Sequence, residues 1–199
     1  RQRLQAAIAP VTVTGRRQEQ VSHEDEHPPR CHLGTVPPLR PAFKPDGSVT
    51  AATASKISDG AAALVLMTAD EAQQRGLEPL ARIVAHATFA QEPEWFTTAP
   101  STAVAMVVEK AGWDMGEVDL FEINEAFASV TMAAMADNNL DHEKVNVNGG
   151  ACALGHPIGA SGARILVTLI HALRKRGLKR GVASLCLGGG EAVAVAIEV

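Results

Sequence analysis

Three short motifs in the second half of the chain combine a reactive or polar side chain with small residues. They are residues 124–127 (NEAF), 155–159 (GHPIG) and 186–190 (CLGGG). An imidazole such as His156 can transfer protons, and a thiol such as Cys186 can act as a nucleophile or as an acid and base. Glycine leaves the neighbouring backbone open to a ligand. The three motifs together therefore predict a ligand-binding or catalytic site.

Each motif taken alone also has a purely structural interpretation. Asn124 would suit a helix cap, His156 would suit a hydrogen bond to a neighbouring carbonyl, and Cys186 would suit a buried strand position. For any single motif we favour that structural interpretation. The surplus of glycine across all three motifs favours a functional one.

The elements that must position the motifs alternate between strand and helix. Residues 118–123 predict a strand that runs directly into a helix from Asn124 or Glu125 to about Asp137, with Asn124 as its cap. Strands are predicted over 81–87, 182–187 and about 193–199, helices over 101–111 and 161–176, and a glycine turn over 188–190. This alternation indicates an α/β layered fold.

The first part of the chain is organised differently. Residues 1–47 are polar and contain seven prolines, so that only 11–13 predict a strand. The apolar run 60–67 (GAAALVLM) predicts a buried strand, and a short helix over 69–75 should follow, closed by Gly76. One strand and one helix cannot form a core, so a proper domain begins only near Leu80.

Composition excludes several classes of protein. The chain has 199 residues, 46% of them hydrophobic, and a net charge of −4, which argues against nucleic acid or an anionic membrane as a partner. No apolar run approaches the roughly 20 residues that cross a bilayer. Three cysteines without C-x-x-C spacing indicate a reducing compartment, so we expect a cytoplasmic protein. The histidines lack the clustering of a zinc site, so we expect no metal.

The motifs NEAF, NVNGGACALGHPIGASGARIL and CLGGGEAVAVAIE resemble the carboxy-terminal motifs of the thiolase family, acetyl-CoA acetyltransferases and 3-ketoacyl-CoA thiolases. LRPAF at 39–43 and SDGAA at 58–62 extend the resemblance more weakly upstream. It implies a thiolase-like layered fold, a mixed sheet with helices on both faces. Ketoacyl-acyl-carrier-protein synthases, which share fold and Claisen chemistry, stay a distant alternative.

The resemblance also implies roles for individual residues. Cys186 matches the cysteine that moves a proton at the α-carbon of acetyl-CoA, and His156 matches the histidine that activates a nucleophilic cysteine. Asn124 matches the asparagine that positions a water beside that histidine in one oxyanion hole, and the amide of Gly188 matches a donor in a second. Ser55 matches the serine at the pantetheine arm, and Phe127 is assigned to substrate binding. Coenzyme A and acyl-CoA enter as substrates, and no cofactor is implied.

Two departures from the family pattern concern catalysis and binding. The family's nucleophilic cysteine belongs to an amino-terminal half that precedes this sequence, and neither Cys31 nor Cys152 has suitable surroundings to replace it. Lys56 stands beside Ser55 where the family has glycine, so a charged side chain could narrow the coenzyme A tunnel. The start at Arg1 rather than Met leads us to expect a truncated, cleaved or incomplete amino terminus.

The resemblance implies three regions: 1–56 as the end of a loop excursion, 57–78 as the tail of a largely missing amino-terminal domain, and 79–199 as the carboxy-terminal domain. The leading hypothesis is an acyl-CoA C-acetyltransferase that condenses acetyl-CoA or cleaves 3-ketoacyl-CoA, with its nucleophile outside this chain. The alternative is a non-catalytic fragment that only binds coenzyme A or a partner. A strand over 60–67 would have no neighbouring strand in a lone second domain. We therefore expect it to pair with sheet of the missing half, in a homo-dimer or tetramer.

Overall fold

A mixed four-stranded sheet is the centre of the molecule. The computed structural model describes the chain except residues 1–3, 16–17, 26 and 31. The strands are β3 (Arg82–Ala90), β4 (Leu120–Ile123), β5 (Arg180–Cys186) and β6 (Glu191–Glu198), in the order β3-β6-β5-β4. β6 is antiparallel to both neighbours, whereas β4 and β5 are parallel.

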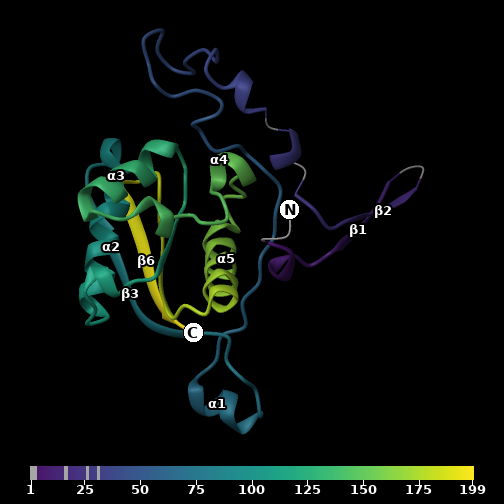
Figure 1. The fold of residues 1–199 in the computed structure, drawn as a ribbon, viewed down its shortest axis with the longest axis vertical. Helices are drawn as coiled ribbons and strands as arrows, with labels where there is room; N and C mark the ends of the chain where they lie inside the picture. Colours follow the sequence, from purple (N-terminus) through teal and green to yellow (C-terminus); the bar gives the residue numbers. More distant parts are fainter. Residues whose placement is uncertain (1–3, 16–17, 26, 31) are drawn as a thin grey trace.

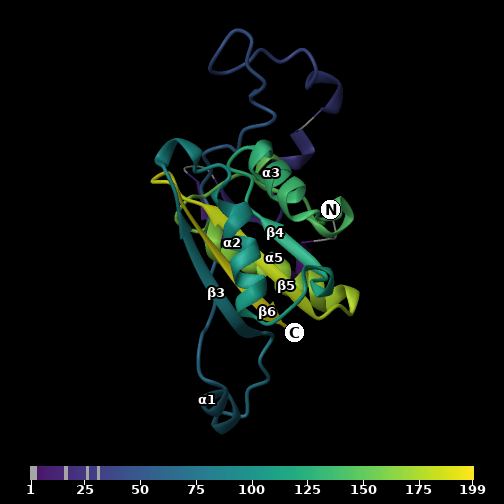
Figure 2. The same ribbon diagram turned by 90° about the vertical axis from the view of Figure 1, so that its left-hand side faces the viewer.

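Helices cover both faces of this sheet (Figures 1 and 2). α2 (Ala99–Lys110) and α3 (Ala128–Asn138) lie on one face, and α5 (Ser161–Arg176) lies on the other. Each face has its own apolar cluster, built around Val104 and Phe121 on the α2 side and around Leu169 and Leu173 on the α5 side. The predicted layered fold with a mixed sheet and helices on both faces is therefore confirmed.

The alternation of side chains along β4 decides what lies beneath α5. Phe121 and Ile123 belong to the α2-side cluster, whereas Leu120 belongs to the α5-side cluster. Because side chains two apart share a face of a strand, Glu122 is placed with Leu120 on the α5 side. α5 approaches β5 so closely that a Cβ at Gly181 would lie within 3.0 Å of the Leu169 and Leu173 side chains. Only glycine allows this approach.

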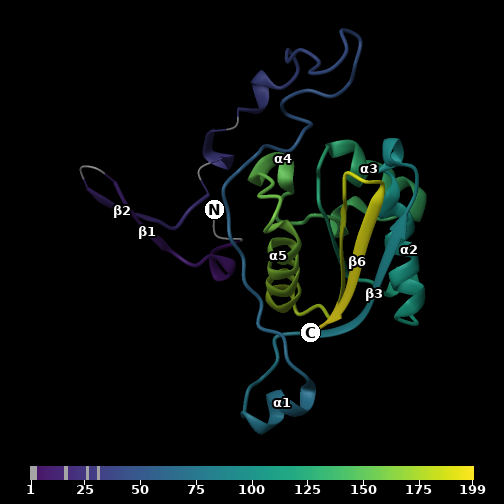
Figure 3. The same cartoon turned by 180° about the vertical axis from the view of Figure 1, so that it is seen from behind.

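The amino-terminal part forms extensions around this body (Figure 3). β1 (Val11–Thr14) and β2 (Glu19–Ser22) form an exposed antiparallel hairpin, and α1 (Ala69–Gln74) lies at the end of a protruding loop, capped by the Thr68 hydroxyl. α4 (Ala151–Leu154) is a single turn before α5. Short 3-10 helices cover Gln5–Ala7, Pro28–Arg30, Leu33–Thr35, Pro93–Trp95, Met115–Glu117 and His142–Lys144.

The predicted buried strand over 60–67 is wrong. Residues 61–68 have no regular secondary structure, and Val65 and Leu66 are 85% and 71% exposed. A strand needs a hydrogen-bonded neighbour, and no strand in the described part of the chain pairs with this segment. The apolar run is therefore a large exposed hydrophobic segment, and exposed segments of this kind commonly mark interaction sites.

The helix after β4 begins later than predicted, and Asn124 is not its cap. α3 starts at Ala128, and its N-terminal neighbour Phe127 is extended and caps nothing with its side chain. Residues 124–127 do not join the helix, because the Ala126 amide donates to the Asn124 carbonyl at 3.1 Å and the segment of residues 53–58 lies against residues 126–128. The Ala128 amide donates to the Thr53 carbonyl at 2.7 Å, and the Ser55 amide donates to the Ala126 carbonyl at 3.0 Å. The other predicted helices and strands from 69 onward are confirmed within a few residues of their bounds.

Candidate active site

The motif residues gather where parallel strands β4 and β5 end. Ile123 pairs with Ser184, and the Asn124 amide donates to the Ser184 carbonyl at 2.9 Å. Cys186 is the last residue of β5, two positions beyond Ser184. Carboxyl ends of neighbouring parallel strands are a common position for ligand sites in α/β proteins, because loops and helix starts converge there.

A chain of polar contacts joins Asn124 to His156 and Ser161. Asn124 is buried, and its Nδ2 lies 3.4 Å from Nε2 of His156. Nδ1 of His156 lies 2.6 Å from Oγ of Ser161, and the Ser161 hydroxyl donates to the Pro157 carbonyl at 3.1 Å. Because that hydroxyl has only one proton to donate, it accepts from His156 Nδ1–H. In the neutral ring, the lone pair is then on Nε2, which can take a proton from a nucleophile.

The electrostatic surroundings favour this neutral ring. Burial lowers the pKa of His156 from its usual value, and the positive charge of Arg164 lowers it further. Both effects disfavour the imidazolium at neutral pH. His156 is thus prepared to act as a base before a substrate arrives and as a hydrogen-bond donor after it has taken a proton.

Residues 53–58, which we call the seam, connect the first part of the chain to the site. The His156 amide donates to the Lys56 carbonyl at 2.9 Å and to the Ser58 hydroxyl at 3.2 Å. Gly155 has a φ of +95°, and a Cβ there would lie 2.1 Å from Ser58 Oγ. The seam also forms hydrogen bonds with residues 126 and 128. It therefore lies between the NEAF and GHPIG motifs and connects them.

Cys186 is the last residue of β5, and Gly188 lies in the turn that follows it. Burial raises the pKa of the Cys186 thiol, which therefore keeps its proton at neutral pH. Gly188 is exposed, and a Cβ there would meet no atom within 4 Å. A protonated thiol at the sheet edge, followed by open glycine backbone, suits proton delivery next to an oxyanion.

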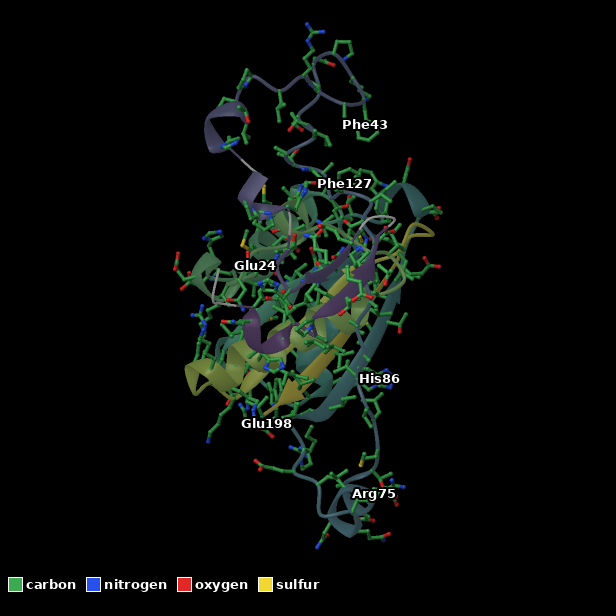
Figure 4. All side chains as sticks on the ribbon, turned by 90° about the vertical axis from the view of Figure 1, so that its right-hand side faces the viewer. Glu24, Phe43, Arg75, His86, Phe127 and Glu198 are labelled. Atoms are coloured by element: carbon green, nitrogen blue, oxygen red, sulfur yellow. The ribbon has the colours of Figure 1, made fainter. Side chains whose placement is uncertain are left out.

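Ser55 and Phe127 are neighbours across the seam. Ala54 forms an isolated bridge with Phe127, and the Ser55 amide donates to the carbonyl of Ala126, so the two residues lie on adjoining stretches of backbone. The Phe127 ring packs edge to face against Phe43, which lies above it in Figure 4, at a centroid distance of 6.3 Å. It packs in the same way against Phe96, at 6.5 Å. This packing accounts for Phe127, so its role in substrate binding stays a prediction, as does that of Ser55.

The other cysteines and Lys56 can be placed relative to this site. Burial and the nearby Glu125 carboxylate raise the pKa of Cys152 to about 12, so it is no thiolate at neutral pH. Cys31 lies outside the described residues. The ammonium of Lys56 contacts the ring of His27 in the amino-terminal excursion, so this side chain is engaged with the protein.

Sequence reasoning missed three residues that contact the site: Ser161, Arg164 and Glu122. Arg164 Nη2 donates to Asn124 Oδ1 at 3.5 Å, and its Nη1 lies 3.8 Å from Oε2 of the buried Glu122. One signal was present, because Glu122 is the single charged residue of the strand LFEI. Such a residue in a buried strand calls for a charged or hydrogen-bonding partner.

Other site types are not indicated by the described residues. No group of three or more His, Cys, Asp or Glu among them could hold a metal ion, and none of their helices is long and apolar enough to cross a membrane. A cavity of about 590 Å³ lies between the amino-terminal part of the chain and α4, with Ile8, Glu24, Asn148 and Leu154 among its lining residues, and His156 does not line it.

Comparison with protein families identifies both parts of the chain. Residues 77–199 match the family described as "Thiolase, C-terminal domain", and residues 1–70 match "Thiolase, N-terminal domain". The mouse (Mus musculus) protein named "Acetyl-CoA acetyltransferase, cytosolic" is 50% identical over 194 residues, which are 96% of this chain and 49% of that protein. The chain thus spans about half the length of the curated relatives it matches.

Solved structures agree in fold. The crystal structure of the Bacillus anthracis acetyl-CoA acetyltransferase superposes with a TM-score of 0.92 at 49% identity, covering 96% of this chain and 48% of that one. Human mitochondrial 3-ketoacyl-CoA thiolase in complex with CoA superposes with a TM-score of 0.83 at 40% identity, covering 90% and 46%.

Proposed function

Because this chain belongs to the thiolase family, we propose that it supplies the acid-base and oxyanion-binding part of an acyl-CoA C-acetyltransferase. The observation that carries the proposal is the line of contacts from Asn124 through His156 to Ser161, at the strand ends where Cys186 also lies. The substrates are acyl-CoA and coenzyme A, as the CoA complex of the human relative supports. Residues 1–56, 57–78 and 79–199 are then the end of the loop excursion, the tail of the first domain and the second domain.

We assign the nucleophile to a cysteine outside this chain. A thiolase nucleophile must become a thiolate, and burial raises the pKa of both described cysteines, Cys152 and Cys186. Nε2 of His156 would take the proton of that cysteine's thiol as the cysteine sulfur attacks the 3-keto carbon of 3-ketoacyl-CoA. The resulting imidazolium would donate a hydrogen bond to a thioester oxygen, and a water positioned by the Nδ2 of Asn124 would donate another.

Cys186 completes the cycle in either direction. In cleavage, the C2–C3 bond breaks, its electron pair moves onto C2 of the departing acetyl-CoA, and the Cys186 thiol protonates that carbon. In condensation, the coenzyme A thiolate released when the acyl-enzyme forms takes the Cys186 proton, and the resulting Cys186 thiolate removes a proton from the same carbon. The amide of Gly188, in the second oxyanion hole, would stabilise the negative oxygen of the tetrahedral intermediate, and Ser55 and Phe127 would border the pantetheine arm.

The proposal includes assembly and location. The exposed run at 61–67 pairs with sheet from an amino-terminal half, within a homo-dimer or tetramer. The cytoplasm is the proposed compartment, supported by the name of the mouse relative and by two described cysteines that form no disulfide.

Two variants test the roles, in an assembly that contains this chain and the missing half. His156→Ala should weaken both acyl transfer and α-proton exchange, and Cys186→Ala should abolish exchange while leaving the acyl-enzyme to form. Loss of a general base or an oxyanion donor costs about a hundredfold or more. The measurements are deuterium exchange at C2 of acetyl-CoA and the mass of the acyl-enzyme. Exchange at the parental rate in Cys186→Ala would remove Cys186 from its role.

The isolated 199-residue chain provides the complementary test. It should bind coenzyme A esters at most, with no acetoacetyl-CoA thiolysis and no covalent acyl group. An acyl mass increment on Cys31, Cys152 or Cys186 would contradict the assignment of the nucleophile. If the complete assembly also fails to turn over, the chain is a binding module only.

A further inference from the structure

Arg164 and Glu122 form a buried ion pair directly behind Asn124. Glu122 is 2% exposed on β4, and the Arg164 side chain is 19% exposed in the first turn of α5. Their closest atoms, Nη1 and Oε2, are 3.8 Å apart, which is outside hydrogen-bond range. Leu120 occupies the same face of β4 and packs into the apolar cluster beneath α5, so an apolar residue would also fit this layer.

Stability alone does not account for this pair. Replacement of a buried ion pair by apolar residues of similar volume is often neutral or stabilising, because two charges lose their hydration. Here the cost is greater, because Arg164 Nε and Nη1 and Glu122 Oε1 have no hydrogen-bond partner within the described residues. Burial raises the pKa of Glu122 to about 8 despite the attraction of Arg164, so at neutral pH the carboxyl is mostly protonated and charge pairing with Arg164 adds little stability. The pair therefore calls for another explanation.

The contact between Arg164 and Asn124 provides one. A guanidinium can only donate hydrogen bonds, so the atom of Asn124 that faces Nη2 at 3.5 Å must be the carbonyl oxygen Oδ1. The amide nitrogen Nδ2 is then turned toward His156 Nε2. Without Arg164, a half-turn of the carboxamide would present an oxygen to His156 and remove the donor from the site.

We propose that Arg164, held by Glu122, is a positioning residue that fixes the Asn124 carboxamide with its N–H toward His156 and the substrate oxygen. This inference rests on the proposed function for its catalytic consequence, whereas the orientation of Asn124 and its effect on His156 do not depend on turnover. Arg164 acts in two ways, through the orientation of Asn124 and through its positive charge, which lowers the pKa of His156.

Titration of His156 in the full 199-residue chain tests the geometry without any reaction. The imidazole resonances are followed by NMR, and His156 is assigned as the resonance absent from His156→Gln. Arg164→Met should raise the pKa of His156, because a nearby positive charge is removed, and Arg164→Lys should keep it near the parental value. Arg82→Met is the matched control, since Arg82 makes an exposed ion pair with Glu198 far along the sheet, and it should leave the pKa unchanged.

Kinetics in the complete assembly tests the catalytic consequence. In Arg164→Met, kcat for thiolysis should fall about a hundredfold with KM changed by less than about threefold, because a small misplacement of a site group has that effect. The acidic limb of its pH profile should move to higher pH, which loss of folded protein alone would not cause. Arg164→Lys should recover part of kcat. An assembly without any activity would overturn the proposed function and leave the titration to decide the positioning role.

A double variant keeps the test valid if Arg164→Met alone fails to fold. Glu122→Gln with Arg164→Met removes both charges, so no unpaired carboxylate remains buried. A folded single or double variant with the parental kcat and the parental pKa of His156 would overturn the proposal.

Discussion

The sheet domain from Arg82 to Val199 and the amino-terminal part before it differ in how tightly their side chains are packed. In the sheet domain, two apolar clusters are almost completely buried, and α2, α3 and α5 pack around the four-stranded sheet. Before residue 78, Ala72 is the single residue of full burial among those described. Yet the seam at 53–58 bonds the backbone of both NEAF and GHPIG. The side chains of Asn124, His156 and Cys186 thus come from the well-packed sheet domain. The seam, which binds the backbone of two of their motifs, belongs to the weakly packed part of the chain.

The largest contrast should appear between two leucines. Leu169→Ala should lower the free energy of unfolding by about 2–5 kcal/mol, because Leu169 is fully buried and leaves a cavity. Leu66→Ala should change it by less than about 0.5 kcal/mol, because Leu66 is exposed. Chemical denaturation of the 199-residue chain measures both. Equal losses would show that residues 61–67 are covered, for example by a second copy of the chain.

A smaller effect is expected where the two regions meet. Gly155→Ala should cost about 1–3 kcal/mol, because a Cβ at φ +95° is strained and would also overlap Ser58 Oγ. Gly159→Ala is the control in the same motif, since its Cβ would meet no atom within 4 Å. Thermal unfolding, with amide exchange at residue 156, measures the loss. If both variants behave alike, the seam does not bind the motif in solution.

The smallest effect should come from the hairpin. Val13→Thr should change the free energy of unfolding by less than about 0.5 kcal/mol, since Val13 is exposed and threonine keeps the β-branched shape of a strand residue. Denaturant titration of this variant beside the parent is sufficient. A loss above about 1 kcal/mol would show that the hairpin is packed against another surface.

Sequence patterns predicted the sheet domain well because its signals are local. The apolar face of residues 161–176 and the glycine after it define α5, and alternation defines β6. The same local reasoning failed at 124–127, which had the sequence of a helix start but lies outside the helix, since residues 126 and 128 form hydrogen bonds with residues 55 and 53. It also failed at 60–67, where apolar residues indicated burial but no described strand is present to bury them.

The site was partly predictable for a related reason. Asn124, His156 and Cys186 were visible because small residues surround them, and the structure brings the first two into contact. Their supports, Ser161, Arg164 and the seam, depend on contacts between distant segments and have ordinary residue types. Glu122 was the exception, because a charge inside an apolar strand is detectable without a structure.

The position of the seam also affects how the protein can be made. The Ser58 hydroxyl can accept the bond from the His156 amide only after His156 has been synthesised, about a hundred residues later in the chain. At synthesis rates of about 5–20 residues per second, roughly 5–20 s pass between synthesis of the seam and synthesis of His156. The seam and the apolar run beside it cannot pack against the GHPIG motif before then. During that interval residues 61–67 are an exposed hydrophobic stretch available to chaperones, so the site is completed late, by a segment that was translated early.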